Sequence, residues 1–145
     1  LDNFKTVNDQ FGHTVGDDVL RTLVDHVKKH IRKTDTLARL GGDEFALLFP
    51  ETPKESASIA LSKLRNSVLQ EMKKKNWPIT LSVGAVTCRA PSLTADELVR
   101  IADELQYSVK VAGKNAIAHS TIGEGRGTID AVEVRRTEMP LAISN

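Results

Sequence analysis

The chain has 145 residues, of which 40% are hydrophobic and 27% charged, and its formal net charge is +1. This length and composition fit one globular domain with a hydrophobic core. The small net charge gives no general attraction to nucleic acid or to an anionic membrane, so we expect no nucleic-acid partner. We expect no membrane segment either, since no apolar run is long enough to span a bilayer. Cys88 is the only cysteine, which excludes an internal disulfide and fits a cytoplasmic location.

The first half of the sequence predicts one helix and a pair of strands. Apolar residues recur at helical spacing over 17–33, which predicts an amphipathic helix. Strands are predicted over 36–40 and 45–49, and the second is apolar enough to be buried on both faces. Two glycines and two acids over 41–44 predict a hairpin turn between them.

The second half alternates helices with strands. A helix is predicted over 53–76, with Thr52 as its N-cap residue and a basic run at its end. Alternation predicts a strand over 79–86. A Thr-x-x-Glu capping box and a closing glycine bound a last helix over 94–113, and a short strand follows over 116–119.

This order predicts an α/β (α+β) fold, with helices covering a mixed, mainly antiparallel sheet. The sequence pattern changes at residue 123. Glycines occur at 123, 125 and 127, and the hydrophobic periodicity after them is weak, which is typical of a flexible stretch. We therefore expect a domain over 1–122 and a C-terminal linker or extension over 123–145.

The predicted turn Gly41-Gly42-Asp43-Glu44 is a candidate binding site. Glycines let a backbone come close to a ligand, and neighbouring carboxylates can hold a divalent cation that in turn holds a polyphosphate. A solvated hairpin turn with two surface acids is the alternative interpretation.

Two further motifs accompany this turn. Residues 4–20 read F-K-x-V-N-D-x-F-G-H-x-x-G-D-x-x-L, and residues 102–115 read A-D-x-L-x-Y-x-x-K-x-x-G-K-N. With R-L-G-G-D-E-F between them, the ordered set resembles the GGDEF family of diguanylate cyclases over residues 1–122. The resemblance implies the fold of the class III nucleotide cyclase catalytic domain, a sheet wrapped by helices. It also implies that two domains, each holding one GTP, form a homodimer and make cyclic di-GMP and two pyrophosphates.

The resemblance assigns roles to the turn and to the chain start. Asp43 matches a metal-bridging catalytic acid for Mg²⁺ or Mn²⁺, with the backbone of Leu1 as a further metal ligand. Glu44 matches an acid that helps to deprotonate the ribose 3′-hydroxyl or supports the metal. Gly41 and Gly42 let the turn pass close to the ribose and α-phosphate.

Other matched residues are implied to bind GTP. Asn8 and Asp17 match the guanine-reading residues, since a carboxylate accepts from the N1–H and N2–H₂ donors and an amide both donates and accepts. A helix N-cap is the alternative for Asp17. Lys5, Lys110 and Lys114 match phosphate contacts, with solvated lysines as the alternative. Lys114 stands where the family often has Arg. The lysine keeps the positive charge but cannot make the two parallel hydrogen bonds of a guanidinium group.

Arg32 and Asp35 form an R-x-x-D string where many family members carry an inhibitory site for the product. Arg can stack on guanine and bind phosphate, while Asp accepts from the base. Arg65 is the candidate for a further arginine of this site. The alternative is a charged helix end without a ligand.

The resemblance also leaves gaps. The family's other metal-bridging acid and its first strand precede the position of Leu1, so we expect a longer natural protein. Asp2 is the second acid of that pattern and is not expected to act as a substitute. Two alternatives to an active cyclase remain: an inactive GGDEF module that binds GTP or cyclic di-GMP as a regulatory domain, and a mononucleotide cyclase.

Overall fold

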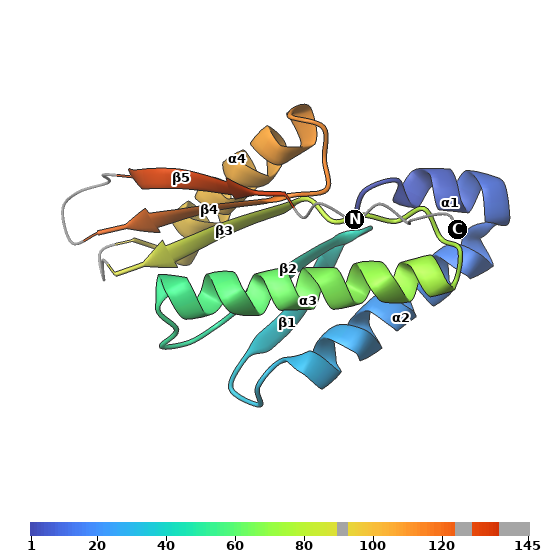
Figure 1. The fold of residues 1–145 in the computed structure, drawn as a ribbon, viewed down its shortest axis with the longest axis horizontal. Coiled ribbons are helices and arrows are strands. Elements are labelled where there is room, and N and C mark those ends of the chain that lie inside the picture. The colour runs from blue at the N-terminus through green and yellow to red at the C-terminus, as the bar shows by residue number, and fades with distance from the viewer. Residues whose placement is uncertain (90–92, 124–128, 137–145) are drawn as a thin grey trace, which may run out of the picture.

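The structure, a computed structural model, describes residues 1–89, 93–123 and 129–136, without the side chains of 129–131. Figure 1 shows helices on the outside of the strands. The elements in chain order are α1 (Phe4–Phe11), α2 (His13–His30), β1 (Thr36–Gly41), β2 (Glu44–Leu48), α3 (Lys54–Lys74), β3 (Val83–Cys88), α4 (Ala95–Val111), β4 (Ile117–Ile122) and β5 (Ile129–Arg135). None of the described helices is long and apolar enough to cross a membrane.

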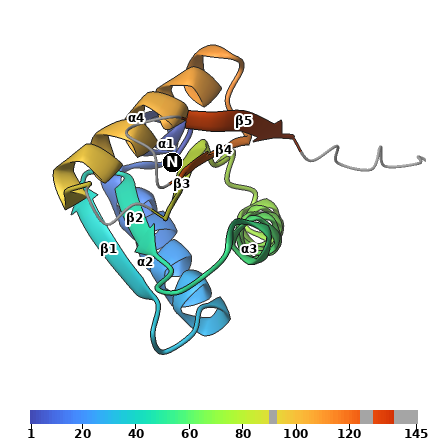
Figure 2. The same ribbon diagram turned by 90° about the vertical axis from the view of Figure 1, so that its left-hand side faces the viewer.

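The strands form a two-stranded and a three-stranded sheet. β1 and β2 pair as an antiparallel hairpin, with Thr36 opposite Leu48. In the other sheet β3 pairs in parallel with β4, and β4 pairs antiparallel with β5. Figure 2 shows the hairpin and the three-stranded sheet set at an angle, with α2 behind the hairpin and α4 along the other sheet. The expected mixed, mainly antiparallel fold wrapped by helices is confirmed.

Two apolar clusters hold these layers together. The larger lies between α1, α2 and α3, and Leu37, Phe45 and Leu47 of the hairpin pack against it. The smaller joins α4 to the segment that enters β4. Burial of such side chains is the main favourable term in folding. The apolar stripes predicted for the three long helices are therefore core faces, with members Leu23, Val27, Leu64, Val68, Met72, Leu105 and Val109.

The capping box predicted at the start of α4 is confirmed, and the helix ends at Val111, with Ala112 rather than Gly113 as its C-cap residue. The N–H of Glu97 donates to Thr94 Oγ1 at 3.3 Å, and the N–H of Thr94 donates to Glu97 Oε2 at 2.7 Å. This capping box lowers the pKa of the Glu97 carboxyl, chiefly through the backbone hydrogen bond from Thr94. At the other end Gly113 takes φ of 107°, and the N–H of Lys114 donates to Val109 O at 2.9 Å, which closes the helix.

Two local predictions were wrong. Thr52 does not cap α3, because its hydroxyl donates to Pro50 O at 2.9 Å and Pro53 is the N-cap residue. The strand after the turn is not buried on both faces, since Leu48 is 63% exposed. β2 lies in a hairpin that places Phe45 and Leu47 on the core and leaves the alternate residues toward solvent.

Two elements were not predicted. α1 occupies the first motif, where the sequence analysis described no helix. β5 lies in the segment 123–145, which was expected to be a linker or extension, and continues the sheet past the boundary placed at Ile122. β5 pairs with β4 alone, at the edge of the three-stranded sheet. Its residues Val132 and Val134 are about half exposed, so their alternation does not mark a strand face buried in the core. Residues 124–128 and 137–145 lie outside the described residues.

A buried histidine connects α3 to the three-stranded sheet. His119 is 3% exposed, and its ring nitrogens lie 2.8 Å from Ser58 Oγ and 2.8 Å from Thr87 Oγ1. Burial lowers the pKa of His119, which favours the neutral ring. Ser58 is only 5% exposed, so no substrate reaches its hydroxyl, and the cluster is part of the core.

Candidate active site

The acidic turn lies at the tip of the β1–β2 hairpin. Gly42 takes φ of 51°, a conformation that favours glycine. Arg39 donates from Nε and Nη2 to Gly42 O at 2.9 and 2.7 Å, which holds the turn from one side. A Cβ built on Gly41 or Gly42 meets nothing within 4 Å, so the space beside the turn is open. Arg39 had no predicted role, and its contact with a turn carbonyl three residues further along the chain is visible only in the structure.

The chain start lies against this turn. The Leu1 nitrogen donates to Asp43 O at 2.9 Å, and the Asp43 side chain is 38% exposed. Glu44, the first residue of β2, is exposed. The structure thus brings together Leu1 and Asp43, the two positions that the resemblance linked to a metal.

The donor set at the turn fits Mg²⁺ or Mn²⁺. Both are hard cations that take oxygen ligands, and Mg²⁺ is commonly bound by one or two carboxylates together with substrate phosphates. Among the described residues no three His, Cys, Asp or Glu side chains gather into a metal site. The Asp43 carboxylate, 38% exposed at the turn, is available as one such oxygen ligand.

Lys114 and Lys5 lie beside the chain start, and Lys110 lies in α4. Lys114 Nζ donates to Asn3 Oδ1 at 3.3 Å, and Asn3 Nδ2 donates to Pro78 O at 3.1 Å. Asn3 is the N-cap residue of α1 but makes no side-chain cap, which leaves the first turn of α1 without that partner. Lys5 is exposed in this first turn, and Lys110 is half-buried in the last turn of α4. Helix N-termini and lysines attract phosphate, so this corner suits a polyphosphate.

The two predicted guanine readers come from different helices. Asn8 lies on α1, and a Cβ built on Gly16 of α2 would be 1.9 Å from Asn8 Oδ1. The Asn8 amide therefore rests on the backbone next to Asp17, which is exposed. α2 begins at His13 with Gly12 as the N-cap residue, so Asp17 lies inside the helix. The helix-cap alternative for Asp17 is wrong.

If Asp17 reads guanine, as the resemblance implies, Asp17→Ala should weaken GTP binding by about 1–3 kcal/mol, because the guanine donors would lose their acceptor. The loss should be smaller for ITP, which lacks the 2-amino group. Titration calorimetry with both nucleotides measures the difference. Asp18→Ala is the matched control, since the Asp18 side chain is 53% exposed and pairs with Arg21. Equal losses for GTP and ITP would remove Asp17 from guanine recognition.

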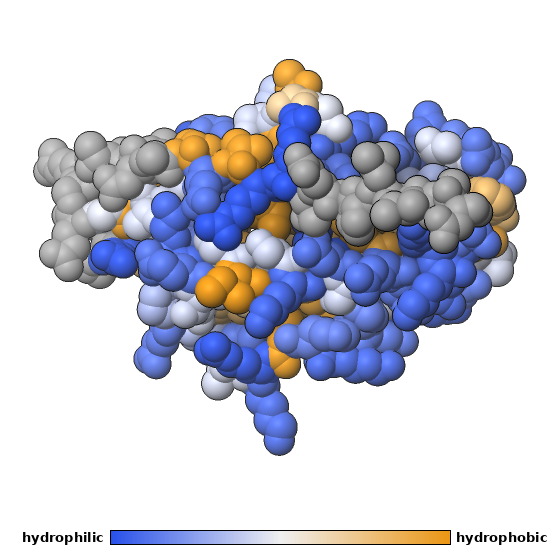
Figure 3. Space-filling model, viewed as in Figure 1, coloured by the Kyte–Doolittle hydropathy of each residue, from blue (hydrophilic) through white to orange (hydrophobic). Residues whose placement is uncertain are grey.

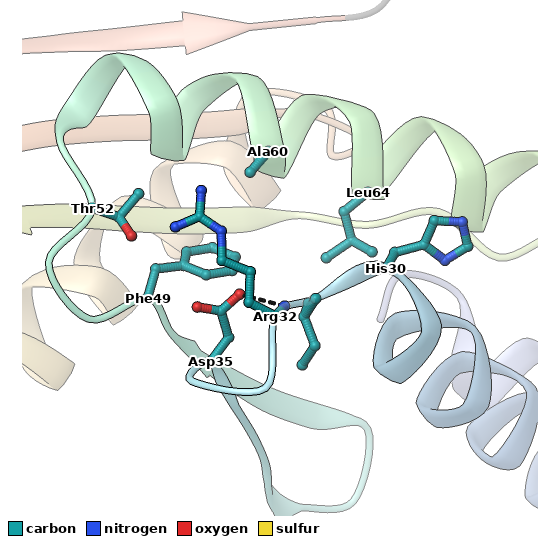
Figure 4. A pocket seen from close by; sticks show the side chains of 8 residues that line it. His30, Arg32, Asp35, Phe49, Thr52, Ala60 and Leu64 are labelled. Carbon is teal, nitrogen blue, oxygen red and sulfur yellow. Dashed lines mark hydrogen bonds between the residues drawn. The ribbon is translucent and has the colours of Figure 1, made fainter.

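A separate hollow lies at the other end of β1. Arg32 and Asp35 follow α2, and the Arg32 N–H donates to Asp35 Oδ2 at 2.8 Å. Figure 4 shows the Arg32 side chain rising from this loop toward α3, above the Asp35 carboxylate. Two adjoining hollows share Arg32, and the larger has a volume of about 410 Å³. The residues lining it include His30, Ser56, Ile59, Ala60, Lys63 and Leu64.

Arg65 was the wrong arginine for this hollow. It is 2% exposed and donates from Nη2 to the backbone carbonyl and side-chain oxygen of Asn115. Lys63, two residues earlier on α3, lines the hollow instead. Successive positions on a helix point about 100° apart, so a shift of two residues changes the face. Sequence spacing alone did not separate these two positions.

The helix-wrapped sheets, the open acidic turn and the basic corner define a candidate nucleotide-binding domain. A family model described as "Diguanylate cyclase, GGDEF domain" matches residues 1–116, and the chain belongs to this family. It is 37% identical over 123 residues to the probable diguanylate cyclase DgcT of Escherichia coli, which covers 81% of this chain and 27% of that relative. It is 33% identical over 120 residues to the diguanylate cyclase DgcP of Pseudomonas aeruginosa, with 81% and 18% covered.

Solved GGDEF domains have the same fold. The GGDEF domain of DgcB from Caulobacter crescentus in complex with c-di-GMP matches with a TM-score of 0.67 and 26% identity, over 81% of this chain and 72% of that chain. The active GGEEF domain of a diguanylate cyclase from Vibrio cholerae matches with a TM-score of 0.66 and 28% identity, over 81% and 76%. The chain spans 27% of DgcT and 18% of DgcP, so it corresponds to one part of these relatives.

Proposed function

We propose that this domain condenses two GTP molecules into cyclic di-GMP, with release of two pyrophosphates, at the interface of two copies. The observation that carries the proposal is the placement of Asp43 beside the chain start, on an open glycine turn. Membership of the family and the names of its relatives support the same activity.

Each group at the site has a chemical task in this proposal. Asn8 and Asp17 bind guanine, while Lys5, Lys110, Lys114 and the first turn of α1 bind the phosphates. Gly41 and Gly42 admit the ribose and α-phosphate. Each 3′-hydroxyl attacks the α-phosphate of the other GTP, Glu44 helps to take its proton, and pyrophosphate leaves. A bound Mg²⁺ or Mn²⁺, held by Asp43 and the Leu1 backbone, would neutralise phosphate charge.

The alternative is a regulatory module that binds GTP or cyclic di-GMP without turnover. Both acids of the turn are present, and the space beside both glycines is open, which favours turnover. The apolar residues on the face in Figure 3 form small separate patches among hydrophilic ones. A broad permanent apolar interface is therefore not expected on that face.

The test is to incubate the protein with GTP and Mg²⁺ and to separate the products by chromatography. We expect cyclic di-GMP, and a rate per domain that rises with protein concentration, because two half-sites must meet. GTP binding without any product would favour the regulatory module, and a cyclic mononucleotide would favour the other alternative. A rate per domain that stays constant while light scattering reports only monomer would contradict assembly at the interface.

The hollow at Arg32 leads us to propose that cyclic di-GMP also binds there and inhibits the enzyme. Bound product would hold two domains in an arrangement in which their half-sites cannot meet. Arg32 and Lys63 supply positive charge for the phosphates, and Asp35 supplies an acceptor for guanine.

Arg32→Ala should weaken product inhibition by about tenfold or more, since a hydrogen-bonded charge contact is lost. GTP binding should be unchanged, because the hollow and the acidic turn lie at opposite ends of β1. Inhibition curves with added cyclic di-GMP measure the shift. Arg21→Ala is the matched control, because Arg21 is 76% exposed on α2 and pairs only with a neighbouring acid among the described contacts. Identical curves for the wild type and Arg32→Ala, displaced by GTP as in competition, would contradict this site.

A further inference from the structure

Asp2 is a buried carboxylate at the edge of the proposed GTP site. It is 3% exposed, and its oxygens accept from Thr80 Oγ1 at 2.8 Å, Ser82 Oγ at 2.7 Å and the N–H of Asn115 at 3.2 Å. Its own N–H donates to Thr80 O at 2.8 Å. These contacts fasten the chain start to two distant segments, the approach to β3 and the loop after α4. A buried ionised carboxylate also requires a compensating positive charge.

Arg65 supplies that charge from α3. Its guanidinium donates to both oxygens of Asn115, whose N–H reaches Asp2, so Asn115 connects the two charged groups. Burial lowers the pKa of Arg65, and the charge of Asp2 opposes this shift. The two opposite charges therefore stabilise each other inside the protein although their side chains are joined through a third residue.

The contacts among Asp2, Asn115 and Arg65 stabilise backbone conformations that would otherwise be unfavourable. Asn3, Lys114 and Asn115 all have positive φ, at 62°, 63° and 54°. Such conformations are uncommon outside glycine, and they persist where surrounding contacts impose them. Arg65 and Asp2 both form hydrogen bonds with Asn115, the residue directly after Lys114.

The two segments joined by these contacts, the chain start and the loop after α4, contain residues of the proposed GTP site. Leu1 is next to Asp2, and its nitrogen donates a hydrogen bond to Asp43 O. Lys114 Nζ donates to Asn3 Oδ1 at the start of α1. We propose that Arg65 is a positioning residue for GTP, fixing through Asn115 the backbone that presents Lys114. The inference rests on the proposed function, because it assigns Arg65 a positioning role within the proposed GTP site.

The test compares GTP and cyclic di-GMP binding by calorimetry in the wild type and Arg65→Gln. Loss of the charge should weaken GTP binding by about tenfold, while product binding at the Arg32 hollow stays within twofold. Arg65→Lys, which keeps the charge, should recover part of the loss. Lys74→Gln is the matched control, since Lys74 is on the same helix, 73% exposed, and pairs with Glu71.

A purely structural role would give a different pattern. It would lower the unfolding temperature and weaken both ligands alike, and that result, or wild-type GTP affinity in folded Arg65→Gln, overturns the inference. If Arg65→Gln does not fold, Asp2→Asn is measured instead, because it removes the opposite charge with little change in shape. A selective loss of GTP affinity in Asp2→Asn supports the inference, and unchanged affinity overturns it. A wild type that binds GTP without making cyclic di-GMP overturns only the proposed activity; one that binds no GTP overturns both.

Discussion

Asp43→Asn should reduce cyclic di-GMP synthesis by about a thousandfold, because the amide keeps the shape of the side chain but loses its negative charge. A metal-binding carboxylate contributes several kcal/mol to stabilising charge in the transition state, and each 1.36 kcal/mol corresponds to a factor of ten in rate. The Asp43 side chain is 38% exposed and lies 3.7 Å from the Leu1 nitrogen, so the substitution should leave the fold intact. Product chromatography at saturating GTP and Mg²⁺ measures the effect.

Asp25→Asn is the matched control for this substitution. Asp25 is an exposed acid on α2, far along the helix from the guanine readers, and its exchange should leave turnover unchanged. A folded Asp43→Asn protein that makes cyclic di-GMP at the wild-type rate would remove Asp43 from the metal site. The same result would leave Glu44 as the remaining acid of the turn to examine.

Gly84→Ala should destabilise the domain by about 3 kcal/mol or more, because its methyl group has no space. A Cβ at Gly84 would lie 1.9 Å from Ala102 O and 2.6 Å from Gln106 N, and both atoms belong to the backbone of α4. A helix backbone cannot yield as a flexible side chain does. α4 would have to move away from β3, opening the cluster around Leu105 and Val109. Urea unfolding followed by circular dichroism measures the loss.

Gly12→Ala separates this steric effect from backbone strain. Gly12 has φ of 86°, but a Cβ there meets nothing within 4 Å. Its ψ is 161°, a combination that almost only glycine adopts, so the substitution should cost about 1–3 kcal/mol from the backbone conformation alone. If Gly84→Ala unfolds at the same urea concentration as the wild type, the close packing of α4 on β3 is contradicted.

Local sequence signals predicted the elements whose ends are fixed by contacts between residues close together in the sequence. The capping box at Thr94 and Glu97 and the glycine at 113 fix both ends of α4 through contacts within a few residues. Apolar spacing identified the core faces of α2, α3 and α4 for the same reason, since the periodicity of a helix is a local property. The signal was weaker for β5, whose apolar side chains Val132 and Val134 are about half exposed.

The sequence by itself determined the family motifs, the acidic glycine turn and the order of the elements from α2 to β4. Tertiary structure decided which of the charged residues meet. It placed Lys63 rather than Arg65 at the hollow, because the face of α3 toward α2 is set by packing, and it buried Arg65 beside Asn115. It also joined Asp2 to Ser82, 80 residues away, through a hydrogen bond of 2.7 Å. Contacts between segments so far apart depend on how the helices and sheets pack, and no local pattern encodes them.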